Sequence, residues 1–431
     1  MRGDSRDELT ADLVAALARA GAEELGADGF VVGRDTRESG PALVAALHAG
    51  VVAAGGRPVD VGVVPTPAVA LWCRAHDVAG AVVSASHNPW YDNGVKFFSA
   101  GGSKLTDSVQ DRIQARFDEL LAEPPPPAVE GVDDRHDAAV SAHISSVVAS
   151  LQGRRLVGLR LVVDAANGAA TPVAEDTFRR LGIDVVMLSD RPDGRNINAD
   201  CGSTHPQALQ AAVVREKADL GVAFDGDADR LVAVDHTGAI VDGDHLIAIC
   251  ALDAHSRGAL AGPAVVVTVM ANLGFRRSMD DAGIEVVDTP VGDRYVLEAL
   301  DDRELDLGGE QSGHVIFRRL APTGDGLLTA AQLLDVVTRR GTRLADLASA
   351  AMTRLPQVLR NVPLVRRHGD LDVRLAPLVT AAETRLAGRG RVLIRASGTE
   401  PLVRVMVEAE TDAEAEMEAD ALAQDVSSLL G

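Results

Sequence analysis

At 431 residues the chain is too long for one hydrophobic core, so several domains of ordinary size are expected. Its 46% hydrophobic and 24% charged residues exclude general disorder and indicate globular packing. The net charge of −21 and the aromatic content of 3% argue against nucleic acid or an anionic membrane as a partner, because both would be repelled and bases would find few rings to stack on.

The N-terminal residues, the lengths of the apolar runs and the cysteines predict a cytoplasmic protein. The first residues, MRGDSRDELT, lack the apolar core of a signal peptide, and no uninterrupted apolar run reaches about 18 residues. Cys73, Cys201 and Cys250 show no paired spacing that suggests zinc or redox chemistry. They are expected to be buried thiols in a reducing compartment.

Strand and helix patterns alternate along most of the chain. Residues 29–47 predict a buried strand, a polar loop and a helix that starts near Ser39 to Pro41, and residues 79–89 predict a second strand with its loop. The same pattern recurs at residues 158–182 and 263–283. Repeated βα units indicate parallel sheets covered by helices, and therefore three related α/β domains.

Two features indicate domain boundaries. The proline run at 124–127 is a stiff connector and places the first domain boundary near it. Residues 389–411 predict a strand, a loop and a second strand, followed by a helix rich in Ala and Glu. This order indicates a smaller α+β domain from about Leu355 onward.

The loop SASHNP, which follows the predicted strand near residue 83, is the first candidate site. In open α/β sheets ligands sit beyond the carboxyl ends of the strands. Ser86 is a candidate nucleophile, with His87 or Lys96 near enough to move protons. The alternative is a plain turn whose Ser and Asn side chains bond to nearby backbone.

The loop AFDGDADR carries three alternating carboxylates, Asp225, Asp227 and Asp229. They point the same way and repel each other, so they need a cation between them unless the loop is a solvated acidic turn. An EF-hand is excluded, because its sixth and twelfth positions hold Arg230 and His236 instead of Gly and Glu. A catalytic Mg²⁺ that leaves one position for a phosphate oxygen fits better.

Two further loops have the composition of sugar and phosphate sites. In LGGEQSGHVIF, the glycines let a ligand approach, and Glu310 with Ser312 can bracket sugar hydroxyls beside Gln311 and His314. RASGTEPLVR offers backbone N–H groups, hydroxyls and guanidinium groups for a phosphate, from Arg395, Ser397, Gly398, Thr399 and Arg404. Taken singly, each loop could be an ordinary hairpin. Together, the four loops indicate phosphoryl transfer on a sugar phosphate.

These motifs, in this order and over nearly the whole chain, resemble the α-D-phosphohexomutase family. SASHNP with YDNGVKFF, DGDADR, GGEQSGH and RASGTEPLVRVMVE most resemble the phosphoglucosamine mutase branch of that family. The resemblance implies three α/β domains with mixed sheets and a smaller C-terminal α+β domain, in a heart-shaped arrangement around a central cleft. The implied ranges are 1–135 for the phosphoserine domain, 136–240 for the metal domain, 241–355 for the sugar domain and 356–431 for the phosphate domain.

The resemblance also implies a role for each site residue. Ser86 is then the phosphoserine and a metal ligand together with Asp225, Asp227 and Asp229, which hold one Mg²⁺ per chain. Lys96, His87 and Arg230 act in catalysis. The sugar phosphate is bound by Glu310, Ser312, His314, Arg395, Ser397, Gly398, Thr399 and Arg404. A hexose 1,6-bisphosphate activates the enzyme, which is a monomer or a homodimer.

One departure from the family concerns the N-terminus. Relatives usually begin with a strand and loop of the form Gly-Thr-Asp-Gly-Val/Ile-Arg-Gly, whereas this chain retains only Arg2-Gly3 after Met1. We therefore expect the first domain to lack its N-terminal strand, either because the start site is set too late, the favoured explanation, or because the strand is truly absent.

Two alternative functions remain open from the sequence. One keeps the mechanism and changes the sugar, as in a phosphomannomutase or phosphoglucomutase, with Gln311 as the discriminating residue. The other is a non-catalytic protein that binds phosphosugars. The presence of Ser86, the three aspartates and Lys96 favours an enzyme.

Overall fold

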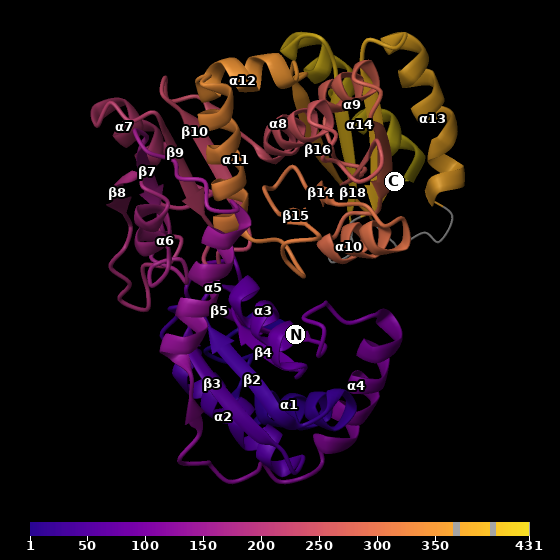
Figure 1. The fold of residues 1–431 in the computed structure, drawn as a ribbon. Helices are drawn as coiled ribbons and strands as arrows, with labels where there is room; N and C mark the ends of the chain where they lie inside the picture. The colour runs from indigo at the N-terminus through magenta and orange to yellow at the C-terminus, as the bar shows by residue number, and fades with distance from the viewer. Residues whose placement is uncertain (365–370, 397–401, 431) are drawn as a thin grey trace. The chain divides into compact units, whose positions relative to one another are not determined.

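The computed structural model of the chain describes residues 1–364, 371–396 and 402–430 (Figure 1). Its internal contacts divide the chain into two units. The larger unit contains Met1–Met270 and Ile284–Ala350, and the smaller contains Ala271–Gly283 and Ala351–Gly431. Among the described helices, none combines the length and apolarity needed to span a bilayer.

The first sheet of the larger unit has six strands in the order β1-β5-β4-β2-β3-β6. β2, β3, β4 and β6 run parallel, whereas β1 and β5 are antiparallel to their neighbours. The strands are β1 (Arg2–Asp4), β2 (Asp28–Arg34), β3 (Arg57–Val63), β4 (Gly80–Val83), β5 (Asp92–Phe98) and β6 (Asp133–Asp134). The helices are α1 (Ala11–Leu25), α2 (Gly40–Ala53), α3 (Thr66–His76), α4 (Asp107–Leu120) and α5 (His136–Ser150).

Helices cover both faces of this sheet, which explains the apolar run of β2. Successive side chains of a strand point to opposite faces. Phe30 and Val32 belong to the core under α1, α2 and α4, whereas Val31 packs with α3 and α5 on the other face. The predicted helix start is confirmed, with Ser39 as the N-cap of α2.

The expectation of a missing N-terminal strand is wrong. Arg2, Gly3 and Asp4 form β1, which pairs with Gly94, Asn93 and Asp92 at the edge of the sheet. The strand is short and polar, so it carries no hydrophobic alternation that the sequence could reveal. Its place is set by backbone pairing with β5.

Two more mixed sheets complete the larger unit. The second has the order β11-β10-β9-β7-β8 and the third β13-β12-β14-β15. The strands are β7 (Arg160–Asp164), β8 (Asp184–Leu188), β9 (Leu220–Phe224), β10 (Leu231–Asp235), β11 (Ile240–Val241), β12 (Ala264–Thr268), β13 (Glu285–Thr289), β14 (Leu307–Gly309) and β15 (Val315–Phe317). The helices are α6 (Ala174–Arg180), α7 (Gln207–Arg215), α8 (Gly243–Ser256), α10 (Asp293–Asp302), α11 (Gly326–Arg340) and α12 (Leu344–Ala351).

The smaller unit is an antiparallel sheet with helices, as the α+β prediction requires. Its order is β16-β18-β17. The elements are β16 (Gln357–Pro363), β17 (Arg391–Ala396), β18 (Leu402–Glu408), α9 (Leu273–Asp281), α13 (Leu371–Leu386) and α14 (Asp412–Leu430). α9 falls within the range predicted for the sugar domain, but the fully buried Glu408 accepts a hydrogen bond from the Leu273 backbone at 2.8 Å. The four domain ranges implied by the sequence therefore remain a prediction.

The fold class is confirmed by these sheets. Three mixed sheets, each from its own stretch of sequence, are followed by the small antiparallel one. The carboxyl ends of β4 and β9 carry the serine and aspartate loops, as the sequence predicted.

Candidate active site

Ser86 is held in the left-handed backbone region directly after β4. Its φ is 54°, and the residue is only 3% exposed. Such a conformation costs a non-glycine residue about 1–2 kcal/mol, so the surroundings must fix it. The Ser86 N–H donates to Ser84 Oγ at 2.9 Å, and Ser84 Oγ donates to Asp35 at 2.6 Å. The loop is therefore built to aim one serine hydroxyl.

Two buried donors hold the carbonyl groups of this loop. Arg37 donates to the carbonyl oxygens of Ser86 and Asn88 at 3.0 and 2.8 Å. Asn198, from the second sheet region, donates to the same two oxygens at 2.9 and 3.1 Å. A Cβ at Gly226 would lie 2.6 Å from the Ser86 carbonyl oxygen, so the aspartate loop approaches the serine loop through a glycine.

The three predicted aspartates lie together and are buried. Each of Asp225, Asp227 and Asp229 offers a carboxylate oxygen within 4.8 Å of the others. Ser86 Oγ donates to Asp225 Oδ2 at 2.5 Å, and Thr66 Oγ1 donates to Asp227 Oδ2 at 2.7 Å. Ser86 and Asp225 are 139 positions apart in the sequence, but they are hydrogen-bonded in the structure.

This cluster suits a cation. Within the described residues, Asp227 Oδ1 and Asp229 Oδ1 are buried without a hydrogen-bond donor. Buried charged oxygens without partners are costly, and a divalent cation would satisfy them. The three aspartates therefore form a candidate metal-binding site.

Lys96 on β5 partly balances the acidic cluster. Its Nζ lies 2.7 Å from Asp227 Oδ2 and 3.7 Å from Asp229 Oδ2. Burial acts to lower the pKa of Lys96, but the charges of Asp227 and Asp229 outweigh it and the pKa is raised. Conversely, burial would raise the pKa values of Asp227 and Asp229, and Lys96 brings both below the usual range.

Asp225 differs from its two neighbours. Burial, with the charges of Asp229 and Asp227, raises its pKa well above the usual value. Burial alone would make Lys96 a neutral base, but the carboxylates of Asp227 and Asp229 favour its ammonium form.

His87 is the second proton-transfer candidate. Its Nδ1 lies 3.4 Å from Ser86 Oγ. Burial and then the charges of Arg230 and Arg2 lower the pKa of His87 to about 4, so its imidazole is neutral near pH 7. The Arg230 backbone N–H donates to Asp225 at 3.2 Å, and its Nε lies 3.9 Å from Asp229. The structure therefore places His87 beside Ser86 and Arg230 beside the aspartates.

The sugar loop is anchored to the neighbouring elements. The Leu231 N–H of β10 donates to the Gly313 carbonyl at 3.0 Å, and the Gly243 N–H of α8 donates to the Gln311 carbonyl at 3.1 Å. Gly313 has φ 90°, and a Cβ there would lie 2.0 Å from the Leu231 oxygen, so only glycine fits. Gln311, the residue expected to discriminate sugars, directs its side-chain amide to Asp244 at 3.1 Å.

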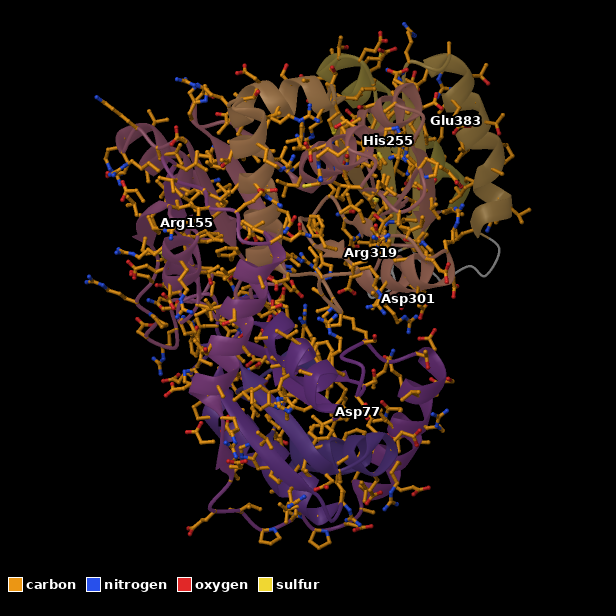
Figure 2. All side chains as sticks on the ribbon, in the orientation of Figure 1. Asp77, Arg155, His255, Asp301, Arg319 and Glu383 are labelled. Carbon is orange, nitrogen blue, oxygen red and sulfur yellow. The ribbon has the colours of Figure 1, made fainter. Side chains whose placement is uncertain are left out.

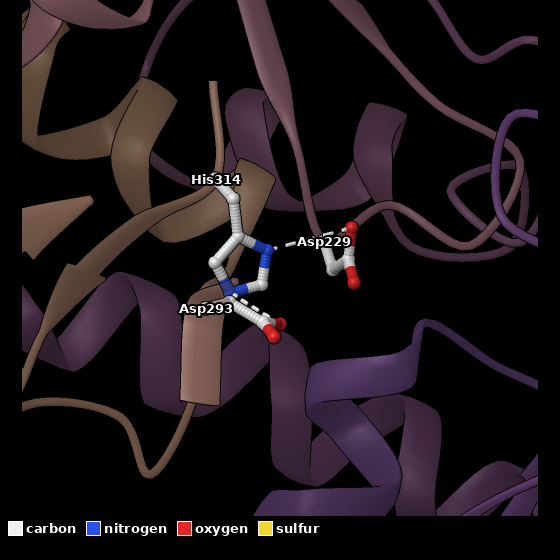
Figure 3. Close-up of side chains that lie close together, drawn as sticks. All are labelled: Asp229, Asp293 and His314. Carbon is white, nitrogen blue, oxygen red and sulfur yellow. Dashed lines mark ion pairs between the residues drawn. The ribbon is translucent and has the colours of Figure 1, made fainter. Parts of the chain in front are cut away.

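The loop brings His314 to the acidic cluster (Figure 3). The imidazole is buried, with Nδ1 3.6 Å from Asp229 Oδ1 and Nε2 3.3 Å from Asp293 Oδ2. Glu310 accepts a hydrogen bond from the Gly292 N–H at 3.2 Å, while Ser312 is exposed. The loop predicted to bind sugar therefore adjoins the predicted metal loop.

The phosphate loop is described only in part. Ser397, Gly398 and Thr399 lie outside the described residues. Arg395 and Arg404 are directly opposite each other on β17 and β18. Burial, and then the charge of Arg404, lower the pKa of Arg395. Two facing guanidinium groups are suited to an anion.

Sequence reasoning missed several supporting residues. Thr66 and Asn198 carry no local signal, because each reaches the site from a distant segment. Arg37 lies in the sequence GRDTR, whose polar residues equally suit the start of a helix. The signal that could have singled it out is position, because Arg37 follows the carboxyl end of β2, beside the end of β4.

We predict that Arg37→Met destabilises the serine loop. Arg37 and Asp35 are fully buried, with Arg37 Nε 3.3 Å from Asp35 Oδ2. Removing one partner of a buried ion pair costs about 3–5 kcal/mol. Both tryptophans, Trp72 and Trp90, lie in the predicted first domain, so urea unfolding followed by tryptophan fluorescence reports on this region.

Arg57→Met is the matched control for that experiment. Arg57 pairs with Asp28 in the same sheet, but the side chains are 83% and 74% exposed. Exposed pairs contribute about 0–1 kcal/mol. Equal losses of unfolding free energy in the two variants would contradict the structural role of Arg37.

Comparison with known proteins places this site in a family. Domain models of phosphoglucomutase/phosphomannomutase match in order, with alpha/beta/alpha domains I, II and III at residues 1–123, 139–238 and 242–355 and the C-terminal domain at residues 337–425. A phosphoglucosamine mutase from Desulforudis audaxviator is 50% identical over 420 residues, covering 96% of this chain and 93% of the relative. One from Frankia alni is 50% identical over 447 residues, covering 100% and 97%.

Solved structures agree with this assignment. A phosphoglucomutase/phosphomannomutase family protein from Burkholderia thailandensis is 29% identical with a TM-score of 0.82, covering 100% of this chain and 96% of that one. The fold alone is shared with Aspergillus fumigatus N-acetylphosphoglucosamine mutase, solved with GlcNAc-6P and magnesium, at 21% identity and a TM-score of 0.64, covering 85% and 93%. The chain therefore belongs to the phosphoglucomutase/phosphomannomutase family, the α-D-phosphohexomutases, as its four loops predicted.

Proposed function

We propose that this chain is an isomerase that interconverts glucosamine 6-phosphate and glucosamine 1-phosphate, a phosphoglucosamine mutase. The observation that carries the proposal is the buried Ser86 hydroxyl, hydrogen-bonded to one of three clustered aspartates. The names of relatives that are 50% identical over nearly the whole chain support the amino sugar as substrate.

In the proposed reaction, Ser86 begins as a phosphoserine. The bond between phosphorus and Ser86 Oγ breaks while phosphorus bonds to a hydroxyl oxygen of the sugar phosphate, which gives a 1,6-bisphosphate. The hydroxyl loses its proton to a base, and Ser86 Oγ regains one. The bisphosphate then turns around and returns its other phosphoryl group to Ser86 in the reverse of this step.

The two proton-transfer candidates suit different tasks. His87 is neutral near pH 7 and can accept a proton at Nδ1, which faces Ser86 Oγ. Lys96 stays an ammonium beside Asp227 and Asp229, so it can donate a proton or stabilise negative charge. Arg230 adds a second cation at the same place.

Mg²⁺ is the proposed metal. Asp225, Asp227 and Asp229 would hold it together with a phosphate oxygen on Ser86, and the oxygen-only donor set suits a hard cation. When bound, Mg²⁺ neutralises charge on the transferring phosphoryl group. A hexose 1,6-bisphosphate is the proposed activator, because it can phosphorylate Ser86.

The remaining loops would bind the sugar phosphate. Glu310, Ser312 and His314 are proposed to hold the sugar. Arg395 and Arg404, with Ser397, Gly398 and Thr399 of the same loop, are proposed to bind the phosphate that is not transferred. The protein is further proposed to be cytoplasmic and a monomer or homodimer.

We predict that Arg395→Met weakens substrate binding more than chemistry. A lost hydrogen bond to a charged group costs about 1.5–3 kcal/mol, so KM for glucosamine 1-phosphate should rise about 10-fold to 100-fold while kcat changes less. Steady-state kinetics measures both. Arg389→Met, which removes a guanidinium group paired with Glu414 in the same unit, should leave both near wild type. A fall in kcat at constant KM would contradict a binding role.

Turnover of three sugar phosphates tests the proposed function. Protein primed with glucose 1,6-bisphosphate and Mg²⁺ is assayed with glucosamine 1-phosphate, glucose 1-phosphate and mannose 1-phosphate. A preference for the amino sugar in kcat/KM is expected. A preference for glucose or mannose would make the chain a phosphoglucomutase or phosphomannomutase, and binding without turnover of any would support the non-catalytic alternative.

A further inference from the structure

Asp293 lies at the active site, although none of the four predicted loops contains it. It is the first residue of α10, next to Gly292, whose N–H donates to Glu310. Figure 3 shows its carboxylate below the His314 ring, next to Nε2, whereas Asp229 lies to the right of the ring, next to Nδ1. The buried imidazole therefore lies between two carboxylates, one from the aspartate loop and one from α10.

Lys104 is the second partner of Asp293. Its Nζ contacts Asp293 Oδ2. Lys104 follows β5, where its backbone forms an antiparallel bridge with Phe98, and the same strand carries Lys96. Burial and then the charge of Lys96 lower the pKa of Lys104 to about 8, so its ammonium form still predominates near pH 7 and can pair with the Asp293 carboxylate.

A second ion pair lies beside the first, and in this pair α10 supplies the positive charge instead of the negative one. Arg294, the next residue of α10, contacts Asp107 at the start of α4. Neighbouring residues of α10 thus carry a negative and a positive charge, and each meets its opposite in residues 104–107. Both pairs link the start of α10 to the connection between β5 and α4.

The same three residues could also be considered a cation site. Asp229, Asp293 and His314 offer ligand atoms within 4.8 Å of one another. However, the Lys104 ammonium already supplies the positive charge at Asp293. The contacts therefore favour an ion pair over a second metal ion.

We infer that Asp293 is a positioning residue for the phosphoryl transfer, held by Lys104 and fixing the ring of His314 against the aspartate loop. The inference rests on the proposed function. A misplacement of about 1 Å at a reacting centre can cost about 100-fold in rate without a matching loss of substrate binding. Loss of the Asp293 charge should therefore reduce kcat and leave KM nearly unchanged.

Asp293→Asn and Lys104→Met test this inference by kinetics. Both should lower kcat for glucosamine 1-phosphate about 10-fold to 100-fold, and Lys104→Arg should recover part of the loss. One control is Asp301→Asn, at the other end of α10, where Figure 2 labels it. Asp301 pairs with Arg318. The second control is Lys217→Met, at an exposed position. A wild-type kcat in Asp293→Asn, or a change confined to KM, would overturn the inference.

A spectroscopic measurement keeps the inference separate from the proposed function. In protein labelled with ¹³C at histidine Cε1, the His314 resonance is assigned by its loss in His314→Gln. It should move in Asp293→Asn and Lys104→Met but not in Asp301→Asn. An unmoved His314 resonance in both variants would overturn the positioning role. If the resonance moves in the variants but the wild type turns over no sugar phosphate, only the proposed function is contradicted.

Calorimetric titration with Mg²⁺ decides between the ion pair and a second metal site. The wild type and Asp293→Asn should bind the same number of Mg²⁺ ions per chain. An additional Mg²⁺ that Asp293→Asn fails to bind would assign Asp293 to a cation and overturn the inference.

Discussion

Ser86→Ala should lower turnover of glucosamine 1-phosphate by at least about 10⁴-fold while substrate binding is largely kept. The physical reason is that Ser86 Oγ is the hydroxyl that the loop presents to Asp225, and alanine removes it without changing the backbone preference at φ 54°. The carbonyl oxygen of residue 86 keeps its bonds from Arg37 and Asn198, so the loop should stay in place. Kinetics and calorimetric binding of glucosamine 1-phosphate measure the two quantities.

Mass spectrometry supplies a direct readout of the same variant. After incubation with glucose 1,6-bisphosphate, the wild type should gain one phosphoryl group on the peptide that contains Ser86, and Ser86→Ala should gain none. Ser108→Ala, which removes an exposed hydroxyl in α4, is the matched control and should behave as wild type. Turnover close to wild type in Ser86→Ala would end its assignment as the nucleophile.

Asp227→Asn should lower turnover about 10³-fold, and the remaining activity should no longer increase when Mg²⁺ is added. The substitution preserves the shape of the side chain and removes one negative charge from a fully buried cluster. It also removes the ion pair with Lys96, whose Nζ lies 2.7 Å from the carboxylate. Activity measured against Mg²⁺ concentration, after treatment with a chelator, gives both effects.

Asp176→Asn is the control for this change. Asp176 is on α6 of the same predicted domain, where its half-exposed carboxylate pairs with Arg180. Its Mg²⁺ response should match that of the wild type. If Asp227→Asn kept an unchanged Mg²⁺ response, the aspartate loop would not be the metal site.

Much of the fold could be predicted because its signals are local. Buried strands such as β4, β9 and β12 are short apolar runs, and the loops after β4 and β9 contain the polar residues that a ligand site needs. β1 was missed because three polar residues carry no pattern, and only the partner strand makes them a strand. The grouping of α9 with the C-terminal sheet was missed because Glu408 contacts it from a distant position.

The candidate site divides in the same way. By itself, the sequence determined which loops carry chemistry, because a serine after a strand and alternating aspartates are recognisable within a few residues. Only the tertiary structure decided that Ser86 meets Asp225, 139 positions away, and that Asn198 holds the serine loop from 112 positions away. It also decided that carboxylates raise the pKa of Lys96 against the effect of burial, and that Asp293 faces His314. These properties depend on distances between segments that chain order leaves open, because Coulomb and hydrogen-bond energies follow separation in space.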